Sequence, residues 1–382
     1  MKKIMNLFRK NDNSKNPFET FSITILSSMM DAEKNILISP CRLMSLLSFL
    51  YEYGSKESKR QIEMLLGIDF GDAEIVQRLM CQSTVLPTEK YESWVRDDDK
   101  QIFKAAICSS LWIDPSIEVS EEVGEKLRKW GIEKKVSSFS SNELQKEIRD
   151  YVAMNTNGQV KKLSMVINPV TKGVLIDCLY FKGKWRMTFD TEDTKPDTFF
   201  GVKKRKTIPF MKVSLMFGQY YACHTFYALN LSYICNCKAR SYSMRIYLPK
   251  EDKTCLDVLR IIKKRDDSFE YKTKPVNLHL PKFSLKSAIN YGEVLKKNGI
   301  EKIQIPLSQN NQSLVIDDII QQGTIRVSEK GTEAGVATCT TMDLGMPRKV
   351  DYLDVKINRP FIFEIVEDHS KARLFAGVVN QL

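Results

Sequence analysis

The pattern of hydrophobic and polar positions predicts helices mainly in the first half of the chain. Apolar residues recur at helical spacing over residues 42–53, so one face of that segment is apolar. Gly54 is expected to end this helix, and Ser55 to cap the next one. Amphipathic patterns of the same kind predict further helices over residues 55–66, 120–130, 141–155 and 291–298.

From about residue 174 the pattern favours strands, because β-branched and aromatic residues form short runs. Strands are expected over residues 174–185, 226–233, 243–248, 276–280, 324–328, 352–357, 361–366 and 373–379. Helices first and strands later favour an α+β fold over alternating βαβ units. No tandem repeat or long linker interrupts the chain, so we expect one domain over residues 1–382, with residues 1–15 flexible.

Composition places the chain among globular proteins with a sizeable core, since 43% of residues are hydrophobic and 27% are charged. No stretch approaches the roughly 20 apolar residues of a membrane span, so no membrane partner is expected. The apolar patch over residues 4–8 is shorter than the 7–15 residues of a secretory signal. Nine scattered cysteines are an odd number. Reduced thiols and a cytoplasmic location are therefore expected.

The formal charge of +11 raises the question of a nucleic-acid or other polyanionic partner. The densest basic run is Lys203–Lys206, between Gly201 and Thr207. No zinc finger, aromatic RNA-binding motif or helix-turn-helix pattern accompanies it. We interpret the run as a solvated hairpin tip, with a nuclear-import signal or a polyanion site as the alternatives.

Catalytic chemistry has few candidates, because the chain has only three histidines to serve as a base. No nucleophile elbow, P-loop, dinucleotide fingerprint or zinc-protease motif occurs. His279 lies on an expected strand, where a side chain facing solvent or a hydrogen bond is the simpler interpretation. Cys235 and Cys237 are expected to pack as ordinary strand residues. No catalytic residue, metal or cofactor is therefore expected.

The segment from Gly331 to Pro347 is unusual, because it contains almost no large apolar residues although strands flank it. From Gly331 to Pro360 the chain runs 29 residues, which is long for an internal connection. Period-two alternation puts four small or β-branched residues on one face: Thr332, Ala334, Val336 and Thr338. One interpretation is a flexible surface loop. The other is a latent strand, small enough to slide between two existing strands.

Six motifs along the chain resemble those of the serpin family. In order they are Asn35–Pro40, Asp177–Trp185, Leu278–Phe283, Glu329–Ala334, Arg359–Phe363 and Leu374–Asn380. The resemblance implies the serpin fold, with about eight to nine helices, three β-sheets and an exposed reactive-centre loop at about 329–358. The expected lack of a secretory signal resembles the intracellular serpins. Ala337-Thr338-Cys339 is similar to poxvirus serpins and agrees with a viral origin.

The resemblance also implies a mechanism. A serine or cysteine protease cleaves the loop of a monomeric inhibitor and stays attached as an acyl-enzyme, while the hinge inserts into a central sheet. About 14 inserted residues at ~3.3 Å each would carry the protease roughly 45 Å. The implied hinge residues are Glu329, Gly331, Thr332, Glu333, Ala334, Val336, Ala337 and Thr338. Their small inward side chains favour an inhibitor over the alternative, a non-inhibitory binding protein with the same fold.

The sequence leaves several candidate positions for the bond that the protease cleaves. Family spacing from Gly331 places it near Leu344, Gly345 or Met346, although Pro347 disfavours cleavage after Met346. Asp343 would suit a caspase or granzyme-B-type pocket, and would make the loop shorter. Arg348 would suit a trypsin-like pocket, and would make it longer.

Several residues match family positions at which the sheet opens. They are Ser39, Arg42 where a serine is usual, Asp177 where an asparagine is usual, Gln321 where a histidine is usual, and Lys282 with Glu329 as an ion pair. A buried arginine alone would cost several kcal/mol. We therefore expect Arg42 to pair with Asp177, unless it extends outward to solvent. Lys282 and Glu329 are expected to form either a latch against premature opening or an ordinary surface pair.

Overall fold

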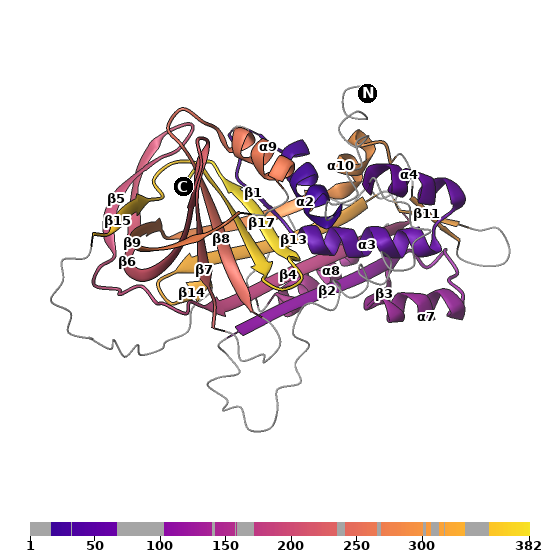
Figure 1. Ribbon diagram of the computed structural model, residues 1–382. Coiled ribbons are helices and arrows are strands. Elements are labelled where there is room, and N and C mark those ends of the chain that lie inside the picture. The colour runs from indigo at the N-terminus through magenta and orange to yellow at the C-terminus, as the bar shows by residue number, and fades with distance from the viewer. Residues whose placement is uncertain are drawn as a thin grey trace.

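The computed structural model describes residues 17–31, 33–66, 103–139, 142–156, 158, 172–234, 241–265, 269–300, 303–306, 313–316, 318–332 and 351–382. Within these ranges the chain forms seven helices and three β-sheets (Figure 1). The helices are α2 (Pro17–Ser28), α3 (Pro40–Tyr53), α4 (Lys56–Leu66), α7 (Glu121–Lys129), α8 (Asn142–Asn155), α9 (Cys255–Arg265) and α10 (Tyr291–Lys297).

The largest sheet has nine strands and forms the strongly curved end of the molecule, at the left of Figure 1. Its order is β1 (Ile36–Ile38), β17 (Arg373–Val379), β16 (Phe361–Glu367), β8 (Tyr242–Pro249), β7 (Phe226–Ser232), β6 (Arg205–Ala222), β9 (Lys272–Pro281) and β15 (Leu353–Lys356), with β5 (Lys195–Phe200) paired to β6. Strand β15 lies at the end of this order and pairs with β9 in parallel over four residues.

The second sheet has six strands and runs along the length of the molecule. Its order is β10 (Phe283–Asn290), β13 (Asp318–Ser328), β14 (Gly331–Thr332), β4 (Gly173–Lys184), β2 (Phe103–Ile113) and β3 (Ile132–Val136). Strands β11 (Ile303–Pro306) and β12 (Ser313–Ile316) form the small third sheet.

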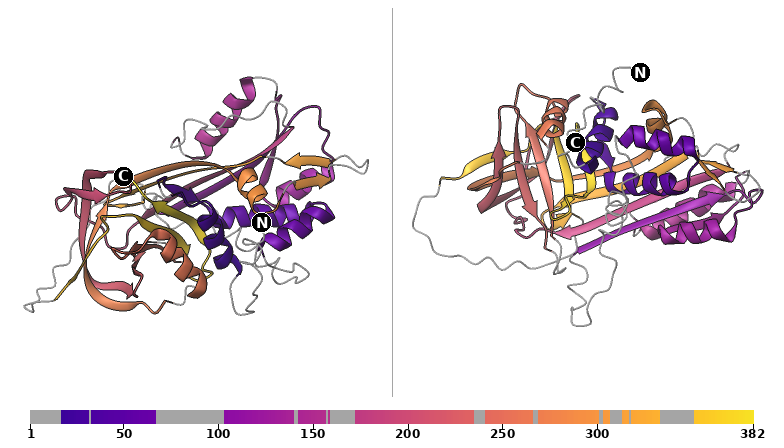
Figure 2. Two further views of the ribbon diagram at one scale, coloured as in Figure 1. Left: turned by 90° about the horizontal axis from the view of Figure 1, so that it is seen from above. Right: turned by 45° about the vertical axis from the view of Figure 1, so that its right-hand side comes forward.

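The two faces of the six-stranded sheet are covered differently, because side chains alternate along each strand. Ile176 and Cys178 of β4 pack with Ile148 and Val152 of α8, which lies on one face. Leu175, on the other face, belongs to the core shared by α2, α3 and α4. Figure 2 shows a helix on the opposite side of the sheet from these three.

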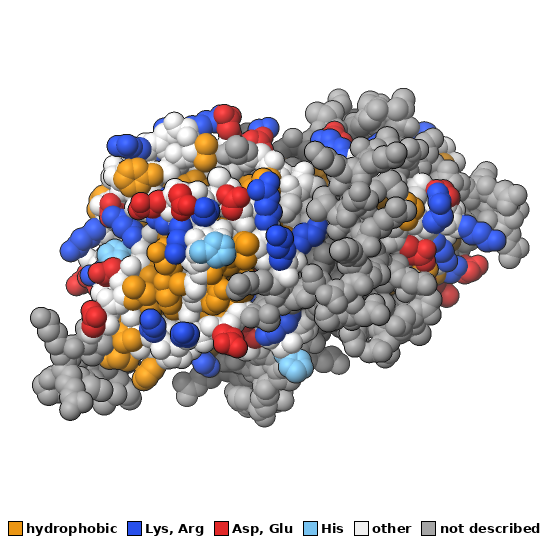
Figure 3. All heavy atoms as spheres, turned by 45° about the horizontal axis from the view of Figure 1, so that its top comes forward, with side chains coloured by type: hydrophobic (Ala, Val, Ile, Leu, Met, Phe, Trp, Pro, Cys, Tyr) orange, Lys and Arg blue, Asp and Glu red, His pale blue; other side chains and the backbone are white. Residues whose placement is uncertain are grey.

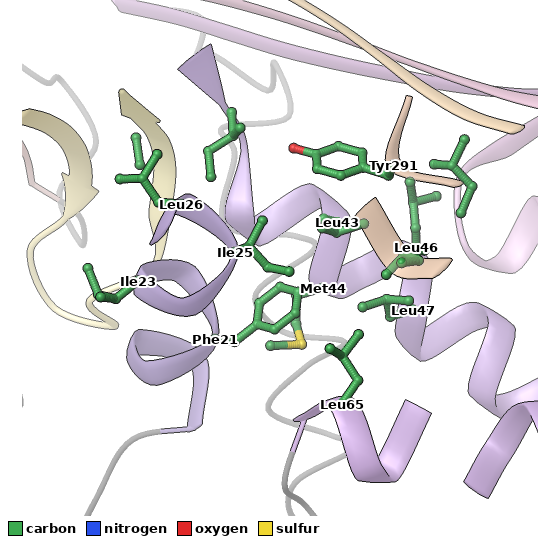
Figure 4. Packing of buried hydrophobic residues seen from close by; sticks show 14 of the residues in the cluster. Phe21, Ile23, Ile25, Leu26, Leu43, Met44, Leu46, Leu47, Leu65 and Tyr291 are labelled. Carbon is green, nitrogen blue, oxygen red and sulfur yellow. The ribbon is translucent and has the colours of Figure 1, made fainter. Parts of the chain in front are cut away.

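The main helical core lies between α2, α3 and the sheets. Figure 4 shows Phe21 of α2 beside Met44 of α3, and Tyr291 over Leu43. All four side chains are at most 2% exposed. The contacts among these four side chains hold the start of α3 against the inner face of the six-stranded sheet.

In the described ranges, no helix combines the length and the apolar character needed to cross a lipid bilayer.

Most expected elements are present, with boundaries shifted by a few residues. Ser120 caps α7 by accepting a hydrogen bond from the Val123 amide, and Ser55 accepts one from the Ser58 amide. Gly54 does end α3, but with φ −77°, so left-handed geometry is not why glycine is needed. A Cβ there would lie 2.3 Å from the Leu50 carbonyl oxygen. The expectation of a mainly helical first half missed β2 and β3.

Candidate functional site

The candidate site is the seam between β4 and β13 of the six-stranded sheet. The two strands pair directly in parallel from Asp318 opposite Val174 to Thr324 opposite Tyr180. Beyond that point β14 lies between them and pairs antiparallel with both, with Thr332 opposite Val327 and Gly183. The seam is therefore closed along most of its length and holds two extra residues at one end.

A buried polar cluster joins the two strands under the closed part of the seam. Gln321 of β13 lies directly opposite Asp177 of β4, and its Nε2 donates to Asp177 Oδ2 at 3.1 Å. Its Oε1 accepts hydrogen bonds from the Ser39 amide at 2.7 Å and the Tyr291 hydroxyl at 2.9 Å. The side-chain amide of Gln321 thus ties the seam to the start of α3 and to α10.

The same cluster contains a buried ion pair. Arg42 Nε lies 3.2 Å from Asp177 Oδ1, and the two side chains are 6% and 0% exposed. Ser109 of β2 donates to the same Oδ1 at 2.6 Å and accepts a hydrogen bond from the Arg42 guanidinium. The expected pairing of Arg42 with Asp177 is present, and Arg42 does not extend to solvent. Ser109 belongs to no motif, so the sequence alone did not indicate its part in this cluster.

Two further groups in this cluster stay neutral at physiological pH. Burial raises the pKa of the Cys41 thiol to about 11 and the pKa of the Tyr291 hydroxyl well above its usual value. The nearby Asp177 carboxylate reinforces the second shift. The seam therefore rests on one positive and one negative side chain, surrounded by neutral donors and acceptors.

A second ion pair lies at the end of the seam occupied by β14. Lys282 Nζ is 2.8 Å from Glu329 Oε1, and the Thr194 hydroxyl donates to the same oxygen at 3.0 Å. The Glu329 side chain is 9% exposed. Burial alone would raise the pKa of Glu329, but the hydrogen bonds from Lys282 and Thr194 hold it below the usual value. Because the folded-state pKa of Glu329 is lowered, the stability that this pair contributes is present above the ordinary glutamate pKa and is lost as pH falls through the lowered value.

The chain on both sides of Glu329 is held mainly by backbone contacts. The Trp185 indole donates to the Ser328 carbonyl at 2.9 Å, and the Trp185 amide to the Lys330 carbonyl at 3.2 Å. The Phe189 amide donates to the Glu329 carbonyl at 3.1 Å. These contacts position the residues from which β14 begins.

Strand β14 itself is wedged into a tight space. Gly331 has φ +147°, and a Cβ there would lie 2.0 Å from the Gly183 carbonyl oxygen, so only glycine fits. Thr332 is fully buried, and its hydroxyl hydrogen-bonds the Tyr233 hydroxyl at 2.8 Å. The Tyr233 ring stacks on Trp185 with centroids 4.6 Å apart. The first two small hinge residues are therefore already part of the sheet.

Several predicted residues lie outside the described ranges. These are the hinge residues Glu333, Ala334, Val336, Ala337 and Thr338, the cleavage candidates Asp343, Leu344, Gly345, Met346 and Arg348, the pair Cys235 and Cys237, and residues 1–15.

The basic run Lys203–Lys206 lies at the turn between β5 and β6, as expected for a hairpin tip. Lys203 Nζ is 2.6 Å from Glu33 Oε2, and the Arg205 guanidinium lies over the Phe200 ring at 5.3 Å. Figure 3 shows basic and acidic side chains interspersed over the left part of the face it presents. Two of the four cations are thus occupied by contacts within the chain, which disfavours a dedicated polyanion site.

His279 lies half-buried on β9, opposite Lys212 of β6 and Lys356 of β15. Burial, followed by the charge of Lys212, lowers its pKa. The charges of Asp354 and Asp197 act on the pKa of His279 in the opposite direction. Among the described residues, no group of three or more His, Cys, Asp and Glu side chains could hold a metal ion.

Replacing one member of the buried pair should destabilise the protein more than replacing both. Arg42→Ser or Asp177→Asn alone leaves an uncompensated buried charge and should each lower the free energy of unfolding by about 3–5 kcal/mol. The double variant should recover most of this loss. Denaturant unfolding measures all three, with Arg260→Ser, in an exposed pair with Asp257, as the control expected to change little. A harmless Arg42→Ser would show that the pair carries no stability.

Reversing one charge of the latch should promote opening of the sheet. Glu329→Lys places two lysines together at the end of the seam and should speed polymer formation on mild heating, measured by size-exclusion chromatography. Adding Lys282→Glu restores an ion pair of opposite orientation and should bring the rate back toward that of the unmodified protein. If Glu329→Lys polymerises no faster than the unmodified protein, the pair is only a surface contact.

Comparison with known proteins agrees with this architecture. The sequence model of the family described as "Serpin (serine protease inhibitor)" matches residues 17–382. Serine protease inhibitor A3K of Mus musculus is 29% identical over 386 residues, covering 94% of this chain and 86% of the relative.

Solved structures show the same fold. The thermophilic serpin Tengpin in its native state superposes with a TM-score of 0.80 at 22% identity, covering 98% of this chain and 95% of that one. Human thyroxine-binding globulin superposes with a TM-score of 0.78 at 21% identity, covering 96% and 97%. With its closed seam and wedged hinge, the chain belongs to the serpin family.

Proposed function

We propose that this serpin is a suicide-substrate inhibitor of a serine or cysteine protease. The target cleaves the loop that follows β14, and the freed hinge inserts between β4 and β13 while the acyl-enzyme is still intact. The observation that carries the proposal is the position of Gly331 and Thr332, which already lie in the seam in antiparallel register with both neighbours. Further residues of the hinge need only continue the strand that β14 begins.

Continuing the register of β14 assigns a partner to each inward-facing hinge residue. Each step forward along the hinge moves one step back along β4 and β13 from Gly183 and Val327. Val336, the largest inward residue, would arrive opposite Gly323, where β13 has no side chain. Thr338 would arrive between Gln321 and Asp177, in place of the hydrogen bond that joins them. Its hydroxyl can accept from the Gln321 amide and donate to the Asp177 carboxylate.

On its outward face, the inserted hinge would bring a negative side chain next to positive side chains of both neighbouring strands. The same register would place Glu333 between Arg326 of β13 and Lys182 of β4. Arg326 is exposed and Lys182 half-exposed, so insertion of Glu333 would bring one negative charge between two positive charges. Such pairs contribute little individually at a surface, but they favour this register over one shifted by a single residue.

Insertion also changes the type of strand pairing. The closed seam is a parallel pair over Asp318–Thr324, and a new strand would replace it with two antiparallel pairs. Antiparallel ladders are slightly more stable per residue, and the number of backbone hydrogen bonds in the sheet increases. The native protein would therefore be metastable, and the released free energy would drive displacement of the protease.

The proposal predicts an SDS-stable complex with at least one protease in a panel that includes chymotrypsin-, elastase-, trypsin- and caspase-type enzymes. Mass spectrometry of the released fragment would identify the bond cleaved among Asp343, Leu344, Gly345, Met346 and Arg348. Cleavage should also raise the thermal stability of the protein. Loop cleavage throughout the panel with no complex and no gain in stability would contradict the proposal.

The register itself is tested at Thr338. Thr338→Glu would bring a second carboxylate against Asp177 in a buried site, at a cost of about 3–5 kcal/mol, and should turn the inhibitor into a substrate that is cleaved without trapping the protease. Thr338→Ser keeps the hydroxyl and should retain the complex. Full complex formation by Thr338→Glu would show that insertion follows another register.

A second candidate function is binding of a small molecule without inhibition. It is favoured by the likeness to human thyroxine-binding globulin, whose structure was solved as a complex with a ligand. The wedged, small-residue start of the hinge favours inhibition over this alternative, because a protein that only binds a ligand has no need of a strand primed to insert.

A further inference from the structure

A pocket with a cavity volume of about 520 Å³ lies between the ends of β6, β7 and β8 on one side and β15 with the residues after it on the other. This volume is within the range of sites that bind small molecules. The sheet order separates β15 from β8 by three strands, but the curvature of the sheet brings the two together. Arg359, which follows β15, contacts the end of β8 directly, because its Nε donates a hydrogen bond to the Pro249 carbonyl at 3.0 Å.

Two tyrosines and two leucines form the aromatic and apolar part of the pocket lining. The rings of Tyr220 and Tyr227 are nearly parallel, with centroids 6.1 Å apart and an interplanar angle of 24°. Leu248 is buried, while Leu353 of β15 is 37% exposed, one of the more exposed large apolar side chains among the described residues. A flat ring in the pocket could contact a tyrosine on one side and cover Leu353 on the other.

Two cations, Lys250 and Arg359, belong to the same pocket lining. Lys250 Nζ lies 5.5 Å from the centroid of the Tyr227 ring. Arg359 is half-buried and held by the Pro249 carbonyl and by the side chain of Asn358. Its Nη2 makes no hydrogen bond to the described part of the chain. An arginine stays charged when it is buried, so an anionic ligand would offset the loss of hydration around Arg359.

The pocket lining also contains three acidic residues. Glu251, Asp252 and Asp354 are exposed, and the Asp252 carboxylate is 2.7 Å from Lys253 Nζ. Lys356, the third cation of the pocket, is paired with Asp197. Water and salt screen the exposed carboxylates more than the half-buried cations. The charge of Glu251 acts on Arg359, but Glu251 is exposed, whereas Arg359 and Lys250 are only partly exposed. The two cations are therefore the less hydrated charges of the pocket.

We propose that this pocket binds a flat aromatic anion, such as an aromatic carboxylate. The ring lies against the two tyrosines and Leu353, and the carboxylate accepts hydrogen bonds from Arg359 and Lys250. A ligand in this position joins β15 to β7 and β8. Because β15 is an edge strand held by four parallel pairs with β9, the ligand makes this strand harder to detach. The pocket thus couples a small molecule to the strand that follows the reactive-centre loop.

Isothermal titration calorimetry with 2-naphthoate tests the proposal on the full chain. Saturable binding is expected, with much weaker binding of 2-naphthylmethylammonium, which carries the opposite charge. Lys250→Gln and Arg359→Gln should each weaken 2-naphthoate binding by about tenfold or more, because each removes one charge-assisted contact. Lys253→Gln, next to the pocket but paired with Asp252, is the matched control and should bind as the unmodified protein does.

Hydrogen exchange gives a second readout that does not depend on the two variants folding identically. Saturating 2-naphthoate should slow exchange of the β15 amides and leave those of α7, far along the chain, unchanged. No saturable binding at millimolar 2-naphthoate, equal affinity for the ammonium compound, or unaltered β15 exchange would each overturn the proposal. These measurements require no protease, so they stand or fall independently of the inhibitory function.

Discussion

The structure depends on the hydrogen bond that Gln321 donates to Asp177 across the seam, and on the buried ion pair of Asp177 with Arg42. Asp177 accepts from three side chains on three different elements, and its carboxylate is completely buried. A buried carboxylate is stable only while its partners remain in place. Any strand that opens the seam must therefore supply a new donor to Asp177, which restricts the residue that can arrive there.

A charged cluster at this place differs in kind from a neutral hydrogen-bond network. Neutral groups lose a modest free energy when one partner moves away, whereas a buried ion that loses a partner is left with a desolvation cost that is no longer fully offset. Of the three side chains that donate to Asp177, Gln321 alone lies across the seam, on β13. Opening the middle of the seam therefore removes one hydrogen bond from a buried carboxylate.

The other end of the seam is controlled by packing and backbone contacts. Trp185 and Tyr233 form a rigid stacked pair, and the hinge begins in the space that they leave. Gly331 is there because any side chain would meet the backbone of Gly183. The Lys282–Glu329 ion pair lies beside this wedge, with the Lys282 side chain partly exposed and the Glu329 side chain nearly buried.

The sequence by itself predicted α10 and the strands β13, β15, β16 and β17, the family motifs and the pairing of Arg42 with Asp177, but not β11 and β12. These follow from local periodicity or from the rule that a buried charge needs a partner. Only the tertiary structure decided that Ser109 bonds Asp177, that Tyr291 bonds Gln321 and that Thr194 bonds Glu329, because each of these three residues is distant in sequence from its partner and belongs to no motif. It alone decided that Gly331 and Thr332 already lie in the sheet and that β15 meets β8 around a pocket. Strand register and sheet curvature arise from long-range pairing, which local patterns do not encode.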